Sequence, residues 1–484
     1  MDMGFLSSDD FVARRSKTLI NNQTAQLDEL PELTRFIQTW SNSYRQEISE
    51  LAFGNSNKLR DEVRLIITIV ARQEGGHIRD TLAVYLNQAI DFESFEIIVL
   101  DNHDTSVKKD ATEAQVAAFQ KEHPEINLLY AYKQWGKDEI ASVGNATKVA
   151  SDIALLRIQA RNQESITTVL VSNDADTVSI EPNYLRAILD EFDHNHETEA
   201  LLTQISVPVA TFRKPNIYAA LSLWDEIDLN VINGEPENLR GASSAYRAAM
   251  YAAVGGYNPK CTQAEDLELG FLIADARQWR PSSVIQLKTT KMTVDPRRIL
   301  ESVANRIPVN EMFYRFESSP EIRSLNNDEL LKRIPDDLDF ELLEEDVDSF
   351  WGCGDTGMYK WRGSRYVDDF HSAATRLGIG YAVKDQRVFL ENIEKLLDNY
   401  EADFGVRPKI IHSTRRPYSA EHLRAIKRFF FTFSDSAISC RKKIAKSLAE
   451  QIRRAQERGD TQIVQKLTGE YERFRIELSN EEKP

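Results

Sequence analysis

Two aspartates one residue apart, Asp174 and Asp176, follow an apolar run at residues 169–172. The run predicts a buried parallel strand, and open α/β sheets bind ligands at the carboxyl ends of such strands. Carboxylate oxygens suit Mg²⁺ or Mn²⁺ carried by a nucleotide diphosphate. The Asp-x-Asp pattern therefore predicts a site for a hard cation, with a solvated turn after a strand as the alternative for so short a motif.

A second acidic pair, Glu265 and Asp266, opens a predicted helix whose apolar residues include Leu269 and Leu272. A carboxylate at such a position can act as general base on an acceptor hydroxyl. The alternative is structural, because the helix macrodipole favours acidic residues in the first turn.

The first predicted strand, residues 63–70, leads into a charged loop. Val70 and Ala71 end the strand, and Arg72 and Glu74 are expected to give polar contacts to a base or a ribose. An ordinary charged loop between a strand and a helix is the alternative. No GxGxxG follows this strand, which argues against a nicotinamide enzyme, and the absence of GxxxxGK[ST] excludes a P-loop.

Two further positions fit the same nucleotide. Asp101 ends a predicted strand at residues 95–100, where a carboxylate can accept the N3–H of a uracil or bind a ribose hydroxyl. Gly144 opens a predicted helix whose backbone N–H groups can face an anion, and Lys148 can add a positive charge for a diphosphate. A plain helix start with a surface lysine is the alternative for Lys148.

Alternating strands and helices must position these residues. Strands are predicted at residues 63–70, 95–100, 126–132, 169–172 and 200–207, and helices at 77–88, 111–123, 144–160 and 183–194. This alternation predicts an α/β fold with a mostly parallel sheet flanked by helices. We expect three parts: a helical extension at residues 1–60, the α/β domain at 61–320, and a mostly helical accessory domain at 321–484. In the first part, one helical stripe is predicted to run from Leu33 through Trp40 to Leu51.

Composition narrows the class of protein. The chain has 484 residues and a net charge of −16, which argues against nucleic acid bound by bulk charge. Its three cysteines are far apart and support neither a disulfide framework nor a zinc site. No signal peptide or membrane-spanning stretch is apparent, so we expect a soluble, cytoplasmic protein. An aromatic, basic run at residues 427–433 is compatible with peripheral membrane contact, although a packed helix is the favoured reading.

Taken in order, these motifs resemble family 2 glycosyltransferases of the GT-A fold over residues 63 to 300. The segments that carry the resemblance are the Arg72–Glu74 loop, Leu100-Asp101-Asn102-His103-Asp104, Asp174-Ala175-Asp176, residues 241–257, Glu265-Asp266-Leu267-Glu268-Leu269-Gly270, Trp279-Arg280 and Pro296-Arg297-Arg298. Asn102 replaces an aspartate of the family pattern, so only Asp101 is assigned to the base.

The resemblance implies a transfer of a sugar from a nucleotide-diphosphate sugar to an acceptor hydroxyl. It implies Mn²⁺ or Mg²⁺ held mainly by Asp176, and Asp174 on the ribose, the sugar or the metal. It implies Asp266 as the catalytic base, with Glu265 beside it. Inversion is the usual outcome in the family, although some GT-A enzymes with similar acidic pairs retain configuration. A UDP-sugar is the favoured donor because Asp101 can accept the N3–H of a uracil, with a GDP-sugar as the alternative.

The chain also departs from the family. The QxxRW motif and membrane helices of processive synthases are absent, which favours single addition. No histidine lies between His196 and His371, so a third metal ligand is undefined, with His371 and His412 as distant candidates. The acceptor is open among a glycan, a lipid-linked molecule and a small molecule. A sugar-nucleotide pyrophosphorylase and a catalytically silent scaffold on the same fold remain the alternatives.

Overall fold

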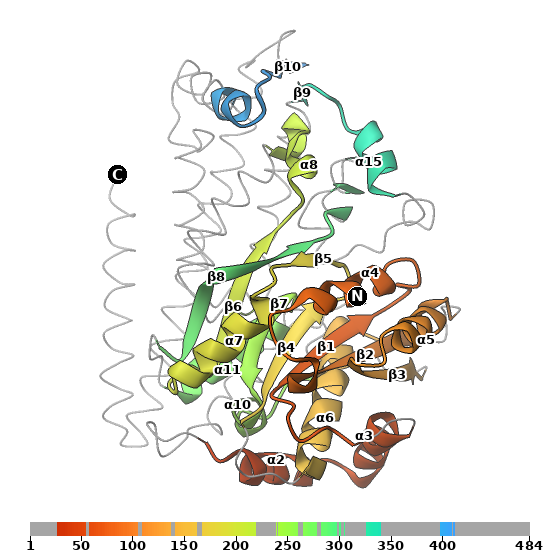
Figure 1. Cartoon of the computed structure of the whole chain (residues 1–484), viewed down its shortest axis with the longest axis vertical. Coiled ribbons are helices and arrows are strands. Elements are labelled where there is room, and N and C mark those ends of the chain that lie inside the picture. The colour runs from red at the N-terminus through yellow and green to blue at the C-terminus, as the bar shows by residue number, and fades with distance from the viewer. Residues whose placement is uncertain are drawn as a thin grey trace, which may run out of the picture. The chain divides into compact units, whose positions relative to one another are not determined.

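The fold is described from a computed structural model of the whole chain (Figure 1). The described residues are 27–54, 58–104, 109–136, 141–161, 167–218, 239, 241–259, 265–277, 282–297, 300–301, 304, 326–339, 397–408 and 410–411. They fall into two compact units, of which one comprises residues 1–208 with 235–295 and the other residues 209–234 with 296–484. None of the described helices is both long enough and apolar enough to cross a membrane.

The first unit is built on an eight-stranded sheet with the order β3-β2-β1-β4-β7-β6-β8-β5. The strands are β1 (Leu65–Ala71), β2 (Phe95–Asp104), β3 (Asn127–Trp135), β4 (Val169–Asp174), β5 (Thr177–Ile180), β6 (Ala200–Ser206), β7 (Ser243–Arg247) and β8 (Val284–Val294). The block β3-β2-β1-β4 is parallel throughout, so its carboxyl ends lie at one edge. β7 pairs antiparallel with both β4 and β6, and β6 pairs parallel with β8. The predicted α/β class with a mostly parallel sheet is confirmed.

Helices cover both faces of this sheet because successive strand residues point to opposite sides. Ile66 and Ile98 pack under α2 (Glu29–Gln38), α3 (Asn42–Phe53), α6 (Val143–Arg161), α10 (Ala248–Ala253) and α11 (Glu265–Ala276). Ile67 and Ile97 pack under α4 (Ile78–Ala83), α5 (Thr112–Glu122) and α7 (Tyr184–His194). Near-continuous apolar strands such as β1 follow from burial on both faces.

The N-terminal helices belong to the same unit as the sheet. Arg157 of α6 makes a two-pronged bond to the buried carboxylate of Glu96, with Nε–Oε2 and Nη2–Oε1 distances of 2.8 and 2.5 Å. Its Nη1 donates to the carbonyl oxygen of Ala52 at the end of α3, at 2.7 Å. One guanidinium therefore joins α3, α6 and the start of β2.

Element boundaries differ from the sequence prediction in three places. The apolar stripe from Leu33 to Leu51 lies on two helices rather than one, because α2 ends at Gln38 and Ser41 caps α3 by accepting from the N–H of Tyr44 at 3.2 Å. The predicted helix at 77–88 ends as α4 at Ala83 and continues as a 3₁₀ turn, η1 (Val84–Asn87). Strand β2 runs on past the predicted end to Asp104. The other predicted strands and helices of residues 63–207 are present, with ends shifted by a few residues at most.

The described elements of the second unit are α8 (Val209–Phe212), α15 (Asn327–Arg333), β9 (Leu338–Asp339), β10 (Ile410–Ile411) and a helical segment at residues 397–404. A three-ring cluster joins the stretch after α8 to the segment at residues 397–404: Tyr218 contacts Tyr400 and Phe404 at centroid distances of 5.2 and 5.8 Å. The domain boundary predicted at residue 320 stays a prediction. The run at 427–433, His371 and His412 lie outside the described residues.

Candidate functional site

The Asp-x-Asp motif lies where β4 ends. Asp174 is the last residue of the strand, and both Asp174 and Asp176 are half-buried. The backbone between them is fixed: Thr81 Oγ1 of α4 donates to the carbonyl oxygen of Ala175 at 2.6 Å, and the N–H of Asp295 donates to that of Asp176 at 2.9 Å. The motif is therefore a rigid turn with two partly exposed carboxylates.

The strand register brings the other predicted nucleotide contacts to the same edge. Val70 is the neighbour of Asp174 across β1 and β4, and Ala71 is the neighbour of Asp101 across β1 and β2. Adjacent strands are about 4.8 Å apart, so Asp101 and Asp174 lie on strands separated by roughly 10 Å. The end of β1 lies between them.

The second acidic pair, Glu265 and Asp266, is connected to this edge by the segment that precedes β7. Ser243 pairs with Asn173, the residue before Asp174. Two residues earlier, the N–H of Gly241 donates to Oδ2 of Asp266 at 2.6 Å. Asp266, in the first turn of α11, is thus bonded to the segment that enters the strand beside the Asp-x-Asp turn.

Glu265 lies among other carboxylates. It is 5% exposed, and burial raises its pKa well above the ordinary value, with further increases from the negative charges of Asp266, Asp174 and Glu268. The contribution of Asp174 places the two acidic pairs within electrostatic reach of each other. A group of carboxylates that destabilise one another's charge is relieved by a divalent cation or by a proton.

The loop after β1 is tightly folded. Gln73 is the one non-glycine residue with a left-handed backbone in the part of the chain that the structure describes, at φ 60°. The carbonyl oxygen of Glu74 accepts from the N–H groups of His77 and Ile78, both at 2.8 Å. Arg72 and Glu74 flank Gln73 and are half-buried. Strained backbone of this kind clusters at ligand sites.

The side chain of Asp101 is enclosed. Tyr130 donates its hydroxyl to Oδ2 at 2.7 Å, and His103 Nε2 lies 2.7 Å from Oδ1. Asp101 and His103 are both fully buried, and burial raises the pKa of the Asp101 carboxyl. The base contact predicted for Asp101 stays a prediction, and this enclosure is taken up below.

Lys148 is turned toward the N-terminal helices. Helix α6 does begin beside Gly144, as predicted. The ammonium of Lys148 forms an ion pair with the buried carboxylate of Asp152, one turn along the same helix, and lies 4.7 Å from the centre of the Tyr44 ring. Because these groups already hold its charge, our proposal for the donor site leaves Lys148 out.

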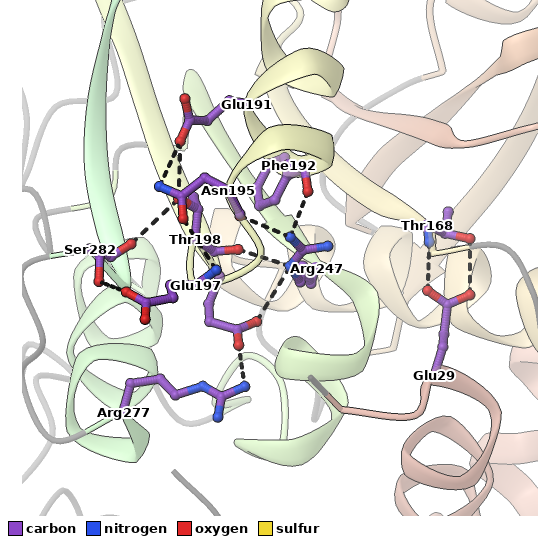
Figure 2. A network of polar contacts seen from close by, with 11 residues as sticks. Glu29, Thr168, Glu191, Phe192, Asn195, Glu197, Thr198, Arg247, Arg277 and Ser282 are labelled. Atoms are coloured by element: carbon purple, nitrogen blue, oxygen red, sulfur yellow. Dashed lines mark hydrogen bonds and ion pairs between the residues drawn. The ribbon is translucent and has the colours of Figure 1, made fainter. Parts of the chain in front are cut away.

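A polar network fixes the far end of α11. Figure 2 shows Arg247, whose guanidinium donates to the carbonyl oxygens of Thr198 and Phe192, both at 2.8 Å. Arg247 also lies 3.7 Å from the carboxylate of Glu199, which accepts from Arg277 at the end of α11. Helix α11 is therefore tied down at both ends, by Gly241 to Asp266 and by Glu199 to Arg277.

Sequence reasoning singled out neither His103 nor Asp110 as a candidate site residue. His103 stood in the Asp101 segment where the family pattern has a glycine, a departure that marks it. Asp110 carried no local pattern, and only the fold brings it near Asp101 and His103.

The residues present fit a hard divalent cation at the Asp-x-Asp turn. Asp174 and Asp176 offer the carboxylates of two half-buried residues on a fixed backbone, and the negative charge of Asp174 disfavours ionisation of Glu265. An ion of this class prefers oxygen ligands and carries phosphate oxygens in its remaining positions.

The similarity of this chain to known proteins is limited to solved structures. No family model and no curated protein matches the chain. Among solved structures, TarS 1–349 from S. aureus is 14% identical and covers 74% of this chain and 92% of its own, with a TM-score of 0.34. The mannosyltransferase PcManGT from Pyrobaculum calidifontis, solved with GDP-Man and Mn²⁺, is 11% identical and covers 84% and 99%, with a TM-score of 0.37. TarS 1–349 with UDP-GlcNAc is 13% identical and covers 73% and 92%, at 0.33. Overlaps of this size carry no functional argument, so the proposal below rests on the strand-end geometry and the order of the motifs.

Proposed function

We propose that this chain is a metal-dependent glycosyltransferase that moves a sugar from a nucleotide-diphosphate sugar to an acceptor hydroxyl. The observation that carries the proposal is the meeting of two acidic pairs at the carboxyl edge of a parallel sheet. Asp174 raises the pKa of Glu265, and Asp266 is bonded to the segment that enters β7 beside β4. Ligands of open α/β sheets bind at this edge.

The roles follow from position. Asp176, with Asp174, would hold Mn²⁺ or Mg²⁺, and the ion would stabilise negative charge on the leaving diphosphate. Val70 and Ala71 at the end of β1, with Arg72 and Glu74 in the loop, would contact the base and ribose. A UDP-sugar is favoured over a GDP-sugar only by the base contact predicted for Asp101, and that preference is lost if Asp101 binds a metal ion instead.

Asp266 is the proposed base for the acceptor hydroxyl. Its Oδ2 accepts the N–H of Gly241 at 2.6 Å, which orients the carboxylate. Glu265 beside it is buried and has a raised pKa, so the two members of the pair differ in environment. One base without an enzyme nucleophile fits a single displacement with inversion.

The test is hydrolysis and transfer by the full chain with a panel of UDP-, GDP- and TDP-sugars, with Mn²⁺ or Mg²⁺. Release of nucleoside diphosphate that disappears in Asp176→Asn supports the proposal. Asp266→Asn should abolish transfer while calorimetry still detects donor binding. The proposal fails if the chain binds and turns over none of these donors, and formation of a nucleotide sugar from a sugar phosphate and a nucleoside triphosphate would identify a pyrophosphorylase instead.

A further inference from the structure

A second cluster of metal-ligating side chains lies away from the Asp-x-Asp turn. Asp101, His103 and Asp110 each bring one carboxylate oxygen or ring nitrogen into a group whose atoms all lie within 4.8 Å of one another. Asp101 is in β2, two strands from Asp174, and therefore about 10 Å from it across the sheet. One ion could not be bound by both sites.

The histidine at the centre of this cluster is buried and lacks a hydrogen bond. Its side chain is 1% exposed, and neither ring nitrogen makes a hydrogen bond to any residue that the structure describes. Nε2 lies 2.7 Å from Oδ1 of Asp101, within ion-pair distance, and Nδ1 on the other side of the ring has no hydrogen-bond partner among those residues. Buried polar atoms left in this state are rare and call for a ligand or an ion.

The distances fit two ligands of a common ion. With metal–ligand bonds of about 2.1 Å, neighbouring ligands lie about 3.0 Å apart in an octahedral site and about 3.4 Å apart in a tetrahedral one. The 2.7 Å separation of Nε2 and Oδ1 is near the octahedral value, and the ligand atoms of the group all lie within 4.8 Å of one another, so only a small adjustment is needed for one ion to contact all three. Two carboxylates and a neutral imidazole also balance the charge of a divalent cation.

Hydrogen bonds from neighbouring groups orient both carboxylates, as is usual for the side chains that bind a metal. Oδ2 of Asp101 accepts from the Tyr130 hydroxyl at 2.7 Å. Asp110 accepts from the N–H of Gly75 on Oδ2 at 2.8 Å and from the N–H of Thr112 on Oδ1 at 3.0 Å. A Cβ on Gly75 would lie 2.9 Å from that Oδ2, so the close approach requires glycine.

We propose that Asp101, His103 and Asp110 bind one divalent transition-metal ion, separate from any ion on Asp174 and Asp176. A mixed set of one imidazole and two carboxylates suits Zn²⁺ or Mn²⁺ better than Mg²⁺, whose ligands are almost all oxygen. Through Asp110 and Gly75, the ion joins the end of β2 to the loop after β1. Its role is to fix that edge of the sheet.

The inference does not rest on the proposed function, and its test measures metal alone. Full-length protein carrying Asp174→Asn and Asp176→Asn is loaded with Zn²⁺ and exchanged into zinc-free buffer containing Mg²⁺. The amount of zinc per chain is then measured by mass spectrometry. One zinc ion per chain is expected to remain. It should be lost when His103→Ala or Asp110→Asn is added. His123→Ala is the matched control, because His123 also contacts a carboxylate, that of Glu125 at 3.4 Å, but in a more exposed pair.

A direct measurement covers the case in which the added variants fail to fold. Zinc-edge X-ray absorption on the Asp174→Asn and Asp176→Asn protein should give nitrogen and oxygen ligands at about 2.0–2.2 Å. The proposal is overturned if this protein retains no zinc, if folded His103→Ala retains as much as its parent, or if sulfur ligands are found. Absence of retained zinc would mean that His103 and Asp101 contact each other without a metal ion between them.

Discussion

Replacing Gly256 by alanine should destabilise the first unit far more than a glycine-to-alanine change usually does. Gly256 has φ +64°, a left-handed conformation that costs an L-residue about 1–2 kcal/mol. A Cβ at this position would also lie 2.8 Å from Cζ and 2.9 Å from Cε1 of the Tyr251 ring. Real Cβ atoms do not approach other atoms so closely, and one of the two groups must move.

The Tyr251 ring cannot move without losing aromatic contacts and a hydrogen bond. Tyr251 is fully buried and stacks on Tyr246 at a centroid distance of 5.5 Å. It meets Tyr257 edge-on at 5.4 Å, and its hydroxyl accepts from the N–H of Tyr257 at 3.2 Å. Overpacking a dense core costs about 1–3 kcal/mol. Added to the backbone strain, the expected loss for Gly256→Ala is about 2–5 kcal/mol.

Urea unfolding followed by circular dichroism measures this loss as a lower midpoint at an unchanged slope. Gly76→Ala is the matched control in the same unit, because Gly76 has no positive φ and a Cβ there would meet nothing within 4 Å. It should change stability by less than about 0.5 kcal/mol. A second change, Tyr251→Leu, removes the crowded ring and should make the pair of substitutions less costly than their sum.

The reasoning is refuted if Gly256→Ala and Gly76→Ala unfold at the same midpoint. It is also refuted if Gly256→Ala and Tyr251→Leu are additive, since the steric contact would then contribute nothing.

Three further predictions concern buried and exposed charges. Burial raises the pKa of Glu29 from 4.5 to about 7, so the folded state binds the proton more tightly than the unfolded state. The free energy of unfolding should therefore fall by about 3 kcal/mol as the pH rises through this range. Glu29→Gln should remove this pH dependence of unfolding, and an unchanged dependence would contradict the prediction. Arg157→Met leaves the buried Glu96 carboxylate without its partner and should cost about 3–5 kcal/mol in urea unfolding, whereas a loss under about 1 kcal/mol would contradict the packing. Asp193→Asn breaks a more exposed pair with Arg64 and should cost less than about 1 kcal/mol, and a larger loss would show that exposure is a poor guide here.

Much of the sheet is readable from the sequence because its strands are local and strongly patterned. Residues 65–71 and 169–174 are apolar runs bounded by polar residues, and each forms the predicted parallel strand. The break between α2 and α3 was not readable from spacing. Phe36, Trp40 and Tyr44 keep their contacts across it, with centroid distances of 5.7 and 5.4 Å, so the apolar stripe continues although the helix does not.

Side-chain partners were harder to foresee, because they depend on which surface a residue meets after folding. Lys148 has the position in sequence of a diphosphate contact, but α6 turns it toward Asp152 and the N-terminal helices. His103 and Asp110 have nothing in common along the chain. They meet because β2 extends past its predicted end and α5 starts beside the loop after β1.

The alternation of strands and helices, the position of Asp174 and Asp176 at a strand end, and the acidic start of α11 can all be predicted from the sequence. These are local properties, set by hydrophobic period and by residues that end a strand or begin a helix. Two features depend on the folded structure: Glu265 lies within electrostatic reach of Asp174, and Asp266 accepts a hydrogen bond from the N–H of Gly241. That meeting depends on the antiparallel pairing of β7 with β4 and on the anchoring of α11 at both ends, which are long-range contacts that no local pattern encodes.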